Sequence, residues 1–330
     1  MVGIWGMFYL CVNDFIMKAV IKINFADFWT HFDKQHNYFT DLLSKYFKVE
    51  IATDPDFLIY SCYGNEHLKY SCYRIFYNGE NQRINWNACD FAFSFDYITD
   101  ERHYRLPNWI WYNDPRLLLQ PKPDIEKMLD NKKGFCNMVV SNPHSSKRID
   151  FFHKLSKYKK IDSGGRHLNN IGAPVNDKLA FISQYTFTLS FENSSYPGYT
   201  TEKIFEPMIA ASIPIYWGNP DVGKDFNTAS FANWHQFGDD RQLIDFIIQL
   251  DSDDELYAKM WQASWYPGNQ LPECVKEENI IAQFEKIFSQ QGKIKPVAQS
   301  VKKYFYGLNR TQKRLDIFLN NRLKYRKGFR

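Results

Sequence analysis

The sequence predicts two α/β domains in tandem, each built around a mostly parallel sheet. Short apolar runs typical of buried strands alternate with connections long enough for helices, and this alternation continues through both halves of the chain. The chain has 330 residues, which exceeds one ordinary domain and suits two domains of about 150 residues each. Hydrophobic residues make up 44% of the chain, enough to build a core in each domain.

The first domain is expected to cover residues 17–125. Its apolar runs predict strands at 19–25, 48–52, 56–61, 73–79 and 90–97. Apolar residues recur at helical spacing late in residues 31–47 and predict a helix there, and an aromatic, apolar run follows at 107–113. Residues 121–133 are polar and contain two prolines, so we interpret them as the linker to the second domain.

The second domain is expected to cover residues 126–285 and repeats the alternation. Its apolar runs predict strands at 135–141, 160–165, 187–193 and 213–218. Helical spacing predicts helices at 146–158, 177–184 and 200–211, and a pair of helices within 241–264. Two such sheets in tandem predict a cleft between the domains, which is where nucleotides bind in open α/β folds.

The net charge of +4 is unevenly distributed. Residues 302–330 contain ten Lys or Arg and one Asp, a net charge of +9, so the rest of the chain carries −5. The slightly acidic body argues against a nucleic-acid-binding protein, although the basic tail and many aromatic residues keep that alternative open. Apolar residues recur every three or four positions among the tail's cations, which is typical of an amphipathic helix on an anionic membrane surface. A helix that packs on the body or on a partner is the alternative.

The cysteines and the N-terminal residues indicate the cellular compartment in which the protein is expected to work. The six cysteines show no C-x-x-C spacing and no accompanying histidine cluster, so we expect reduced thiols in a cytosolic protein and no zinc site. The N-terminal apolar run has no basic residue before it and is interrupted by Asp14, which fits neither a signal peptide nor a spanning helix. Met17 directly precedes the first predicted strand, and we expect the natural chain to start there.

Residues 191–220, FENSSYPGYTTEKIFEPMIAASIPIYWGNP, contain the densest group of candidate site residues. Thr200 and Thr201 suit a helix N-cap, and the exposed N–H groups of a helix start bind phosphate. Lys203 falls in the first helical turn, where the helix dipole disfavours a cation. A cation at this unfavourable position indicates an anion site, in which Lys203 would neutralise a diphosphate. The alternative is that Lys203 is a solvated surface lysine.

A second cation lies after the predicted strand at 135–141. That strand ends in Ser141-Asn142 and leads through a polar loop into a helix that carries Arg148. Ligands of open α/β sheets bind at the carboxyl ends of strands, and the forked guanidinium suits a diphosphate. Lys147 is then a surface charge.

A carboxylate follows the predicted strand that ends at Gly79. Glu80 projects from this strand end in the first domain and is a candidate general base that faces the cleft. A polar turn residue is the alternative. The pairs Asp54/Asp56 and Asp251/Asp253 lie apart from the candidate cations, so we do not interpret them as metal sites.

These residues occur within four blocks of characteristic sequence. VVSNPHSSKRIDFF, LSFENSSYPGYTTEKI and IPIYWGNPDVGKDFN, in this order and spacing, resemble the α-1,3/4-fucosyltransferases of glycosyltransferase family 10, bacterial type. The upstream block FYNGENQRINWNACDFAFSFDY looks like the acceptor-domain motif of that family. The resemblance covers residues 19–285 and implies a GT-B fold. It makes 17–125 the acceptor-binding domain and 126–285 the donor-binding domain, with the basic tail at 286–330.

The resemblance also implies a reaction. Members transfer L-fucose from GDP-β-L-fucose with inversion, here to O3 of GlcNAc in a galactosyl-GlcNAc acceptor, with no cofactor and no metal needed for the chemistry. Glu80 then matches the general base, and Arg148 and Lys203 match the cations that hold the donor diphosphate. Glu202 would stabilise the sugar cation or hold fucose hydroxyls. The expected donor-binding residues also include Tyr199, Asn193, Ser141 and Asn142.

Several points stay open at this stage. The family often has Val where this chain has Thr200, and Pro197 is less typical in the loop 194–199 that we expect to close over the donor. A GT-B enzyme that uses another nucleotide sugar is the alternative function. The acceptor could be a type 1 or type 2 galactosyl-GlcNAc unit or glucose. The basic tail fits a cytoplasmic enzyme that is peripheral on the inner membrane face.

Overall fold

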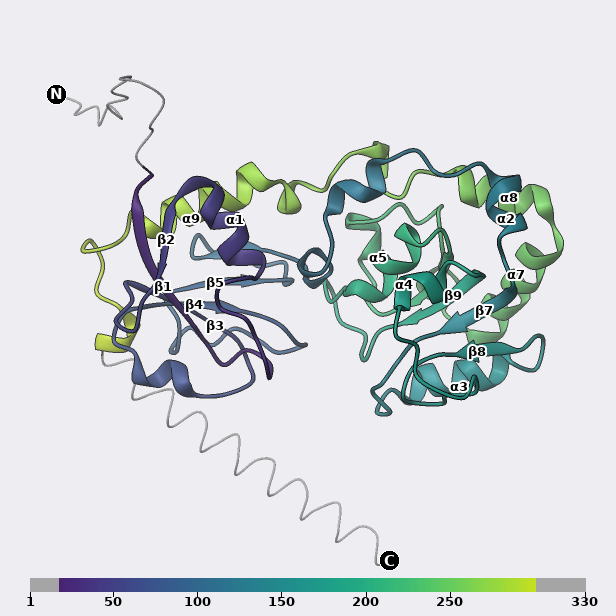
Figure 1. Ribbon diagram of the computed structural model, residues 1–330, viewed down its shortest axis with the longest axis horizontal. Coiled ribbons are helices and arrows are strands. Elements are labelled where there is room, and N and C mark those ends of the chain that lie inside the picture. The colour runs from purple at the N-terminus through teal and green to yellow at the C-terminus, as the bar shows by residue number, and fades with distance from the viewer. Residues whose placement is uncertain (1–17, 301–330) are drawn as a thin grey trace, which may run out of the picture.

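The computed structural model describes residues 18–300, and these form two α/β halves that lie side by side (Figure 1). Each half is built on a sheet in which every strand pair is parallel, as the sequence predicts. The first sheet has the order β2-β1-β3-β4-β5-β6 and the second has the order β11-β10-β9-β7-β8. Because the strands of each sheet are parallel, their carboxyl ends meet at one edge, where side chains of neighbouring strands come together.

The central strands of the first sheet are buried on both faces, and its edge strands are partly exposed. Its bounds are β1 Val20–Ala26, β2 Lys48–Ile51, β3 Phe57–Tyr60, β4 Tyr73–Tyr77, β5 Phe91–Ser94 and β6 His103–Arg105. All residues of β3, β4 and β5 are buried, as expected for central strands of a parallel sheet. The five strands predicted from sequence are confirmed, and β6 is an additional edge strand.

Helix α1, Tyr38–Tyr46, lies within the range predicted for it but begins later. Asn37 is its N-cap, and the side-chain oxygen accepts hydrogen bonds from the backbone N–H groups of Phe39 at 3.0 Å and Thr40 at 3.1 Å. The preceding residues are not helical because this cap satisfies the first free N–H groups and fixes the start of the helix.

The second sheet follows the predicted alternation of strands and helices. Its strands are β7 Gly134–Met138, β8 Ile161–Ser163, β9 Tyr185–Phe191, β10 Ile213–Trp217 and β11 Ala232–Asn233. The helices are α3 Ser146–Leu155, α4 Lys178–Ile182, α5 Glu202–Ile209, α6 Trp234–Phe237, α7 Asp240–Ser252 and α8 Asp254–Gln262. Every strand and helix predicted for this half is therefore present.

The first connection between the halves carries short helical turns. The aromatic run at 107–113 forms the 3₁₀ turn η2, Asn108–Trp111, and η3, Pro115–Leu119, follows. The segment interpreted as a linker, 121–133, contains the short helix α2, Ile125–Asp130, because the Asp124 side chain caps its first turn.

Tryptophans of η2 anchor this connection in both halves. Trp109 stacks on Phe205 of α5 with ring centroids 5.3 Å apart, whereas Trp111 stacks on Tyr77 of β4 at 4.8 Å. The turn therefore bridges the two halves, and the residues between and after the two rings lie where the halves meet.

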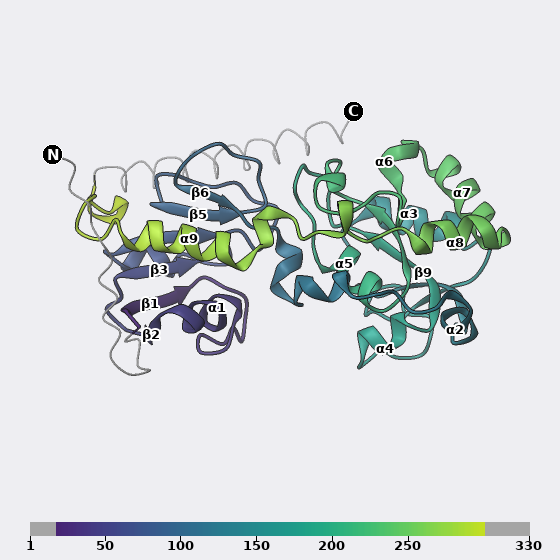
Figure 2. The same cartoon turned by 90° about the horizontal axis from the view of Figure 1, so that it is seen from above.

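A second connection returns the chain to the first half. Helix α9, Glu277–Phe288, packs on the first sheet, where Phe284 lies 4.6 Å from Phe93 and 5.7 Å from Phe39 between ring centroids. Figure 2 shows α9 running along the first half. The predicted boundary at residue 285 falls within α9, and Phe284 in this helix packs on the core of the first half.

The described residues that follow helix α9, up to residue 300, remain in contact with the first half. Residues after the helix stay on the first half, where the backbone N–H of Val297 donates to Asp90 at 2.7 Å. The basic segment 302–330 lies outside the described residues, as do residues 1–16. Within residues 18–300, no helix combines the length and apolar character needed to cross a bilayer.

We predict that Phe284→Ala lowers the free energy of unfolding by about 3–5 kcal/mol, because it leaves a cavity between α9 and the first sheet. The measurement is urea unfolding followed by tryptophan fluorescence. Glu285→Ala is the control, because Glu285 is an exposed neighbour in the same helix and should change the free energy by less than about 0.5 kcal/mol. Equal stability of the two variants would contradict the packing described for α9.

Candidate active site between the two halves

A central cavity of about 200 Å³ lies where the two halves meet. The first half contributes residues that follow the carboxyl ends of its strands, and the second half contributes the start of α5 and the segment before it. The bridging turn closes the cavity between them. The lining residues are Trp29, Tyr63, Tyr77, Gly79, Glu80, Asn108, Trp111, Tyr112, Asn193, Tyr199, Thr201, Glu202 and Lys203.

Glu80 comes to this cavity from the end of β4. The strand stops at Tyr77, and the turn that follows is held by Asn78, whose side chain donates to the backbone oxygen of Gln82 at 2.6 Å and accepts from the N–H of Glu80 at 3.3 Å. The hydroxyl of Tyr63 donates to the Glu80 carboxylate at 3.2 Å. Burial, and then the charge of Glu80, raise the pKa of Tyr63, so this hydroxyl remains protonated as a donor at neutral pH.

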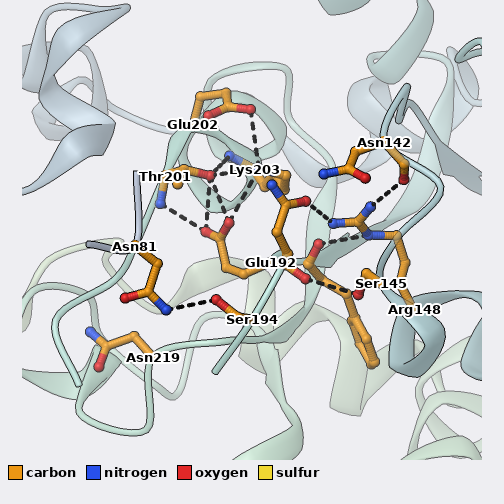
Figure 3. Close-up of polar contacts among 12 residues, drawn as sticks. Asn81, Asn142, Ser145, Arg148, Glu192, Ser194, Thr201, Glu202, Lys203 and Asn219 are labelled. Carbon is orange, nitrogen blue, oxygen red and sulfur yellow. Dashed lines mark hydrogen bonds and ion pairs between the residues drawn. The ribbon is translucent and has the colours of Figure 1, made fainter. Parts of the chain in front are cut away.

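In the second half, a buried carboxylate holds the charged residues of the site in place. This carboxylate is Glu192, which directly follows β9 (Figure 3). Its side chain accepts hydrogen bonds from the backbone N–H of Thr201 at 2.7 Å and from the Thr201 hydroxyl at 2.8 Å. It also lies 3.2 Å from the Lys203 ammonium. Thr201 is the N-cap of α5, as predicted, so Glu192 fixes both the cap and the cation of the first helical turn.

The charges around Lys203 explain how a cation is held at a helix N-terminus. Burial opposes the charged form of Lys203, but the nearby carboxylates of Glu192 and Glu202 outweigh burial and raise its pKa. For Glu202, burial also opposes ionisation, but Lys203 and then Lys178 lower its pKa from 4.5 to about 2. Both side chains are therefore charged at neutral pH and line the central cavity together.

Arg148 occupies a deeper position than predicted. It is 1% exposed and does not line the cavity. Its guanidinium donates to the backbone oxygen of Phe191 at 2.9 Å and to the side-chain oxygen of Asn193 at 2.7 Å, and it reaches the backbone oxygen of Asn142 at 3.4 Å. Arg148 thus holds Asn193, which does line the cavity, in a fixed orientation.

The loop 194–199 lies against the first half. Ser194 accepts a hydrogen bond from the Asn81 side chain at 2.8 Å, and the guanidinium of Arg83 lies 3.7 Å from the ring centroid of Tyr196. Gly198 has a φ of 84°, and a Cβ there would lie 2.2 Å from the Phe95 carbonyl oxygen. Only glycine allows this close approach, so the loop bridges the halves beside the cavity.

The structure brings together five of the eight predicted site residues. Glu80, Asn193, Tyr199, Glu202 and Lys203 all line the central cavity. Arg148 lies beneath it, and Ser141 and Asn142 lie outside its lining, with Asn142 in contact with Arg148 only through its backbone oxygen.

Sequence reasoning missed Glu192, Tyr63 and the residues of the bridging turn. One signal was present for Glu192, since it directly follows a strand in which Phe187, Leu189 and Phe191 alternate with small polar residues, and a carboxylate must be paired when it is buried. No comparable signal marked Tyr63 or Tyr112, because their positions depend on how the halves meet. Across residues 18–300, no group of three or more His, Cys, Asp or Glu side chains is arranged to hold a metal ion.

Two family descriptions match this chain and together span most of it. The α-(1,3)-fucosyltransferase FucT N-terminal domain matches residues 23–112. The C-terminal domain of glycosyltransferase family 10 (fucosyltransferase) matches residues 129–302, more than half of the chain. This chain belongs to glycosyltransferase family 10. The two matches correspond to the first sheet with the bridging turn and to the second half with α9.

Relatives of this family 10 chain agree with the assignment. The α-(1,3)-fucosyltransferase FucT of Helicobacter pylori is 31% identical over 286 residues, which cover 73% of this chain. The match spans 59% of the length of that relative. The α-(1,3)-fucosyltransferase B of Drosophila melanogaster is 33% identical over 128 residues, which cover 34% of this chain and 28% of the relative.

Solved structures show that the family 10 chain has the predicted GT-B architecture. A crystal structure of an α1,3-fucosyltransferase superposes with a TM-score of 0.72 at 26% identity, covering 86% of this chain and 93% of the other. A second, an α1,3-fucosyltransferase with GDP, superposes with a TM-score of 0.70 at 28% identity, covering 82% and 91%. The resemblance proposed from the four sequence blocks is therefore confirmed.

We predict that Glu202 makes stability depend on pH. Its pKa is lowered in the folded state, so its contribution is complete above the unfolded value of 4.5 and is lost as the pH falls from 4.5 toward 2. The free energy of unfolding of the natural chain should therefore exceed that of Glu202→Gln at neutral pH, and this difference should shrink below about pH 5. Urea unfolding from about pH 7 to about pH 3 measures it.

Glu126→Gln is the control, because Glu126 is an exposed carboxylate of α2 and its removal takes away no buried ion pair. A difference for Glu202→Gln that stays constant over the whole pH range would show that Lys203 and Lys178 do not stabilise the Glu202 carboxylate.

Proposed function

We propose that this chain is an inverting fucosyltransferase that moves L-fucose from GDP-β-L-fucose to O3 of GlcNAc in a galactosyl-GlcNAc acceptor. Three observations support the proposal. The chain belongs to the fucosyltransferases of family 10. A solved relative 28% identical to it is described with GDP. The central cavity combines a carboxylate from one half with a cation from the other.

The single observation that carries the mechanism is the shared cavity of Glu80 and Lys203. Glu80 lies in the half that the family assigns to the acceptor, and Lys203 lies at the start of α5 in the other half. An inverting transfer needs a base on one face of the sugar and a charge that stabilises the leaving group on the opposite face. The two residues approach the cavity from opposite halves, which fits this requirement.

The proposed reaction is a single displacement. The Glu80 carboxylate takes the proton of the acceptor hydroxyl while the acceptor oxygen forms a bond to C1 of fucose. The bond from C1 to the GDP oxygen breaks, and its electron pair leaves on the diphosphate. Attack on the face opposite the leaving group converts the β-linked donor into an α-linked product, through a transition state with positive charge on the sugar ring.

The charged residues of the second half stabilise the two charges that develop in the transition state, the negative charge on the diphosphate and the positive charge on the sugar ring. Lys203, held in its charged form, neutralises the diphosphate as the bond breaks. Glu202, ionised at neutral pH, stabilises the positive sugar ring or accepts hydrogen bonds from fucose hydroxyls. Arg148 supplies positive charge beneath the cavity and orients Asn193, and Tyr199 completes the donor pocket.

No metal has a role in this proposal, because Lys203 and Arg148 already supply the positive charge that a metal would give. Activity should therefore survive a chelator. Complete loss of activity in EDTA that Mn²⁺ restores would show that the reaction depends on a metal.

We predict that Glu80→Gln lowers kcat by about 100-fold or more while GDP affinity stays unchanged, because a general base acts in the chemical step and not in donor binding. The assay is fucose transfer from GDP-fucose, together with calorimetric titration of GDP. Glu126→Gln, outside the cavity, is the control and should keep full activity. Normal turnover by Glu80→Gln would remove Glu80 from the mechanism.

Donor and acceptor are tested with the unaltered protein. Purified chain is incubated with GDP-fucose and either type 1 or type 2 galactosyl-GlcNAc disaccharide, and product linkage is determined. An α1,3-linked product from the type 2 disaccharide supports the proposal. Transfer from another nucleotide sugar, with none from GDP-fucose, would support the alternative donor.

We also propose that the chain works in the cytoplasm, peripheral on the inner membrane face through residues 302–330. These residues carry ten cations and lie outside the described residues, so the support comes from sequence alone. The arrangement of cations around apolar positions suits an anionic lipid surface, to which each cation near the surface adds about 1 kcal/mol.

We predict that truncation before Lys302 abolishes co-sedimentation with anionic vesicles at physiological salt and leaves fucose transfer in solution intact. Neutral vesicles are the control and should bind neither form, because the attraction is electrostatic. Equal sedimentation of both forms would remove the membrane proposal. Loss of activity in solution would show instead that the segment packs on the body or on a partner.

A further inference from the structure

A second, larger cavity adjoins the site. It is an open groove of about 690 Å³ that runs along α1 and the start of α9, and we name it the α1 groove. Its lining includes Tyr46 of α1, Trp111 at the end of the bridging turn, Tyr112 directly after it, and Glu277 of α9. Its volume falls within the range of roughly 300–1,000 Å³ typical of ligand sites, whereas the central cavity, at about 200 Å³, is smaller than that range.

The α1 groove and the central cavity share two lining residues, Trp111 and Tyr112. Trp111 is held between Tyr77 and Phe39, with ring centroids at 4.8 Å and 5.2 Å. Its fixed position makes the bridging turn a rigid boundary between the two spaces. Because Tyr112 lines both spaces, a ligand too long for the central cavity would pass this ring to reach the groove.

Exposed tyrosine rings line both the central cavity and the α1 groove. In the described part of the chain, four tyrosines stand out for exposure, namely Tyr46 at 44%, Tyr63 at 46%, Tyr97 at 39% and Tyr112 at 57%. Tyr63 and Tyr112 line the central cavity, and Tyr112 and Tyr46 line the α1 groove. Three of the four therefore line one or both of these spaces, and the hydroxyl of Tyr63 donates to the Glu80 carboxylate. Amphipathic rings of this kind, apolar on the face and polar at the tip, suit the faces and hydroxyls of sugar rings.

The charges of the groove favour a neutral ligand. Its lining has four acidic and three basic side chains, and two of the basic ones are paired within the groove, Lys45 with Glu277 at 2.6 Å and Arg116 with Asp114 at 2.6 Å. The Tyr46 hydroxyl also donates to Glu277 at 2.9 Å. Such pairs offer hydrogen-bonding groups without a free cluster of cations, so a phosphate or an anionic headgroup has no charge to bind here.

We propose that the α1 groove binds the sugars of an acceptor glycan that lie beyond the residue receiving fucose. The proposal rests on the proposed function, because it extends the acceptor side of the same site. Tyr112 is the ring at the boundary, and Tyr46 is a stacking platform farther along the chain of sugars. The preferred acceptor is then an oligosaccharide longer than a disaccharide.

Tyr46→Ala tests this with two acceptors, a galactosyl-GlcNAc disaccharide and a hexasaccharide of three such units. The kcat/KM for the hexasaccharide should fall by about 10-fold relative to the natural chain, with KM carrying the loss. The value for the disaccharide should stay within about two-fold, because Tyr46 does not line the central cavity. Tyr46→Phe keeps the ring and should keep most of the hexasaccharide activity.

Leu68→Ala is the matched control, since Leu68 is an equally exposed side chain, 40%, in η1, Glu66–Lys69, and does not line the groove. An unchanged value for the hexasaccharide in Tyr46→Ala, or an equal loss with both acceptors, overturns the proposal. If the natural chain transfers fucose to neither acceptor, the proposed function fails, and the groove is then judged by saturation-transfer NMR with the hexasaccharide alone. Absence of hexasaccharide binding to the natural chain, or equal binding to Tyr46→Ala, overturns the groove proposal in that case.

Discussion

The buried carboxylate of Glu192 is the interaction on which the site depends. A carboxylate with no solvent exposure is stable only when its oxygens are paired, and here the cap residue Thr201 and the ammonium of Lys203 pair them. The same contacts fix the first turn of α5 and compensate the dipole that would otherwise repel a lysine there. A structural need of the fold, a neutralised Glu192, therefore also positions the cation that faces the cavity.

Aromatic packing sets how the two halves face each other around that cation. Trp109 and Trp111, two residues apart, anchor the bridging turn in opposite halves. A buried ion pair reinforces this geometry, since Arg105 of β6 binds Asp225 with both terminal nitrogens at 2.6 Å and 2.8 Å. Such fixed contacts hold Glu80 at a defined position relative to α5. The site is thus a property of the interface, and neither half contains it alone.

How much of this could be predicted from sequence depends on the range of the interaction. Strands such as β9 and the cap at Thr201 follow from local periodicity and local hydrogen bonding, and both were predicted. The four blocks also contain Glu80 and Lys203, which line one cavity in the structure. The depth of Arg148 and the role of Glu192 were not predicted, because burial depends on residues distant in sequence. The same reason explains why the groove beside α1 and the packing of α9 left no local pattern.

The order in which the elements are synthesised differs from the order in which they pack. All strands of the first sheet, from Val20 to Arg105, leave the ribosome before the second sheet begins, but α9 emerges after the second sheet is complete. Until then Phe39 and Phe93 lack the ring of Phe284 that covers them. The second half, whose strands and helices are contiguous between Gly134 and Gln262, can close its core during translation. The half that is translated first is thus the half whose core is completed last.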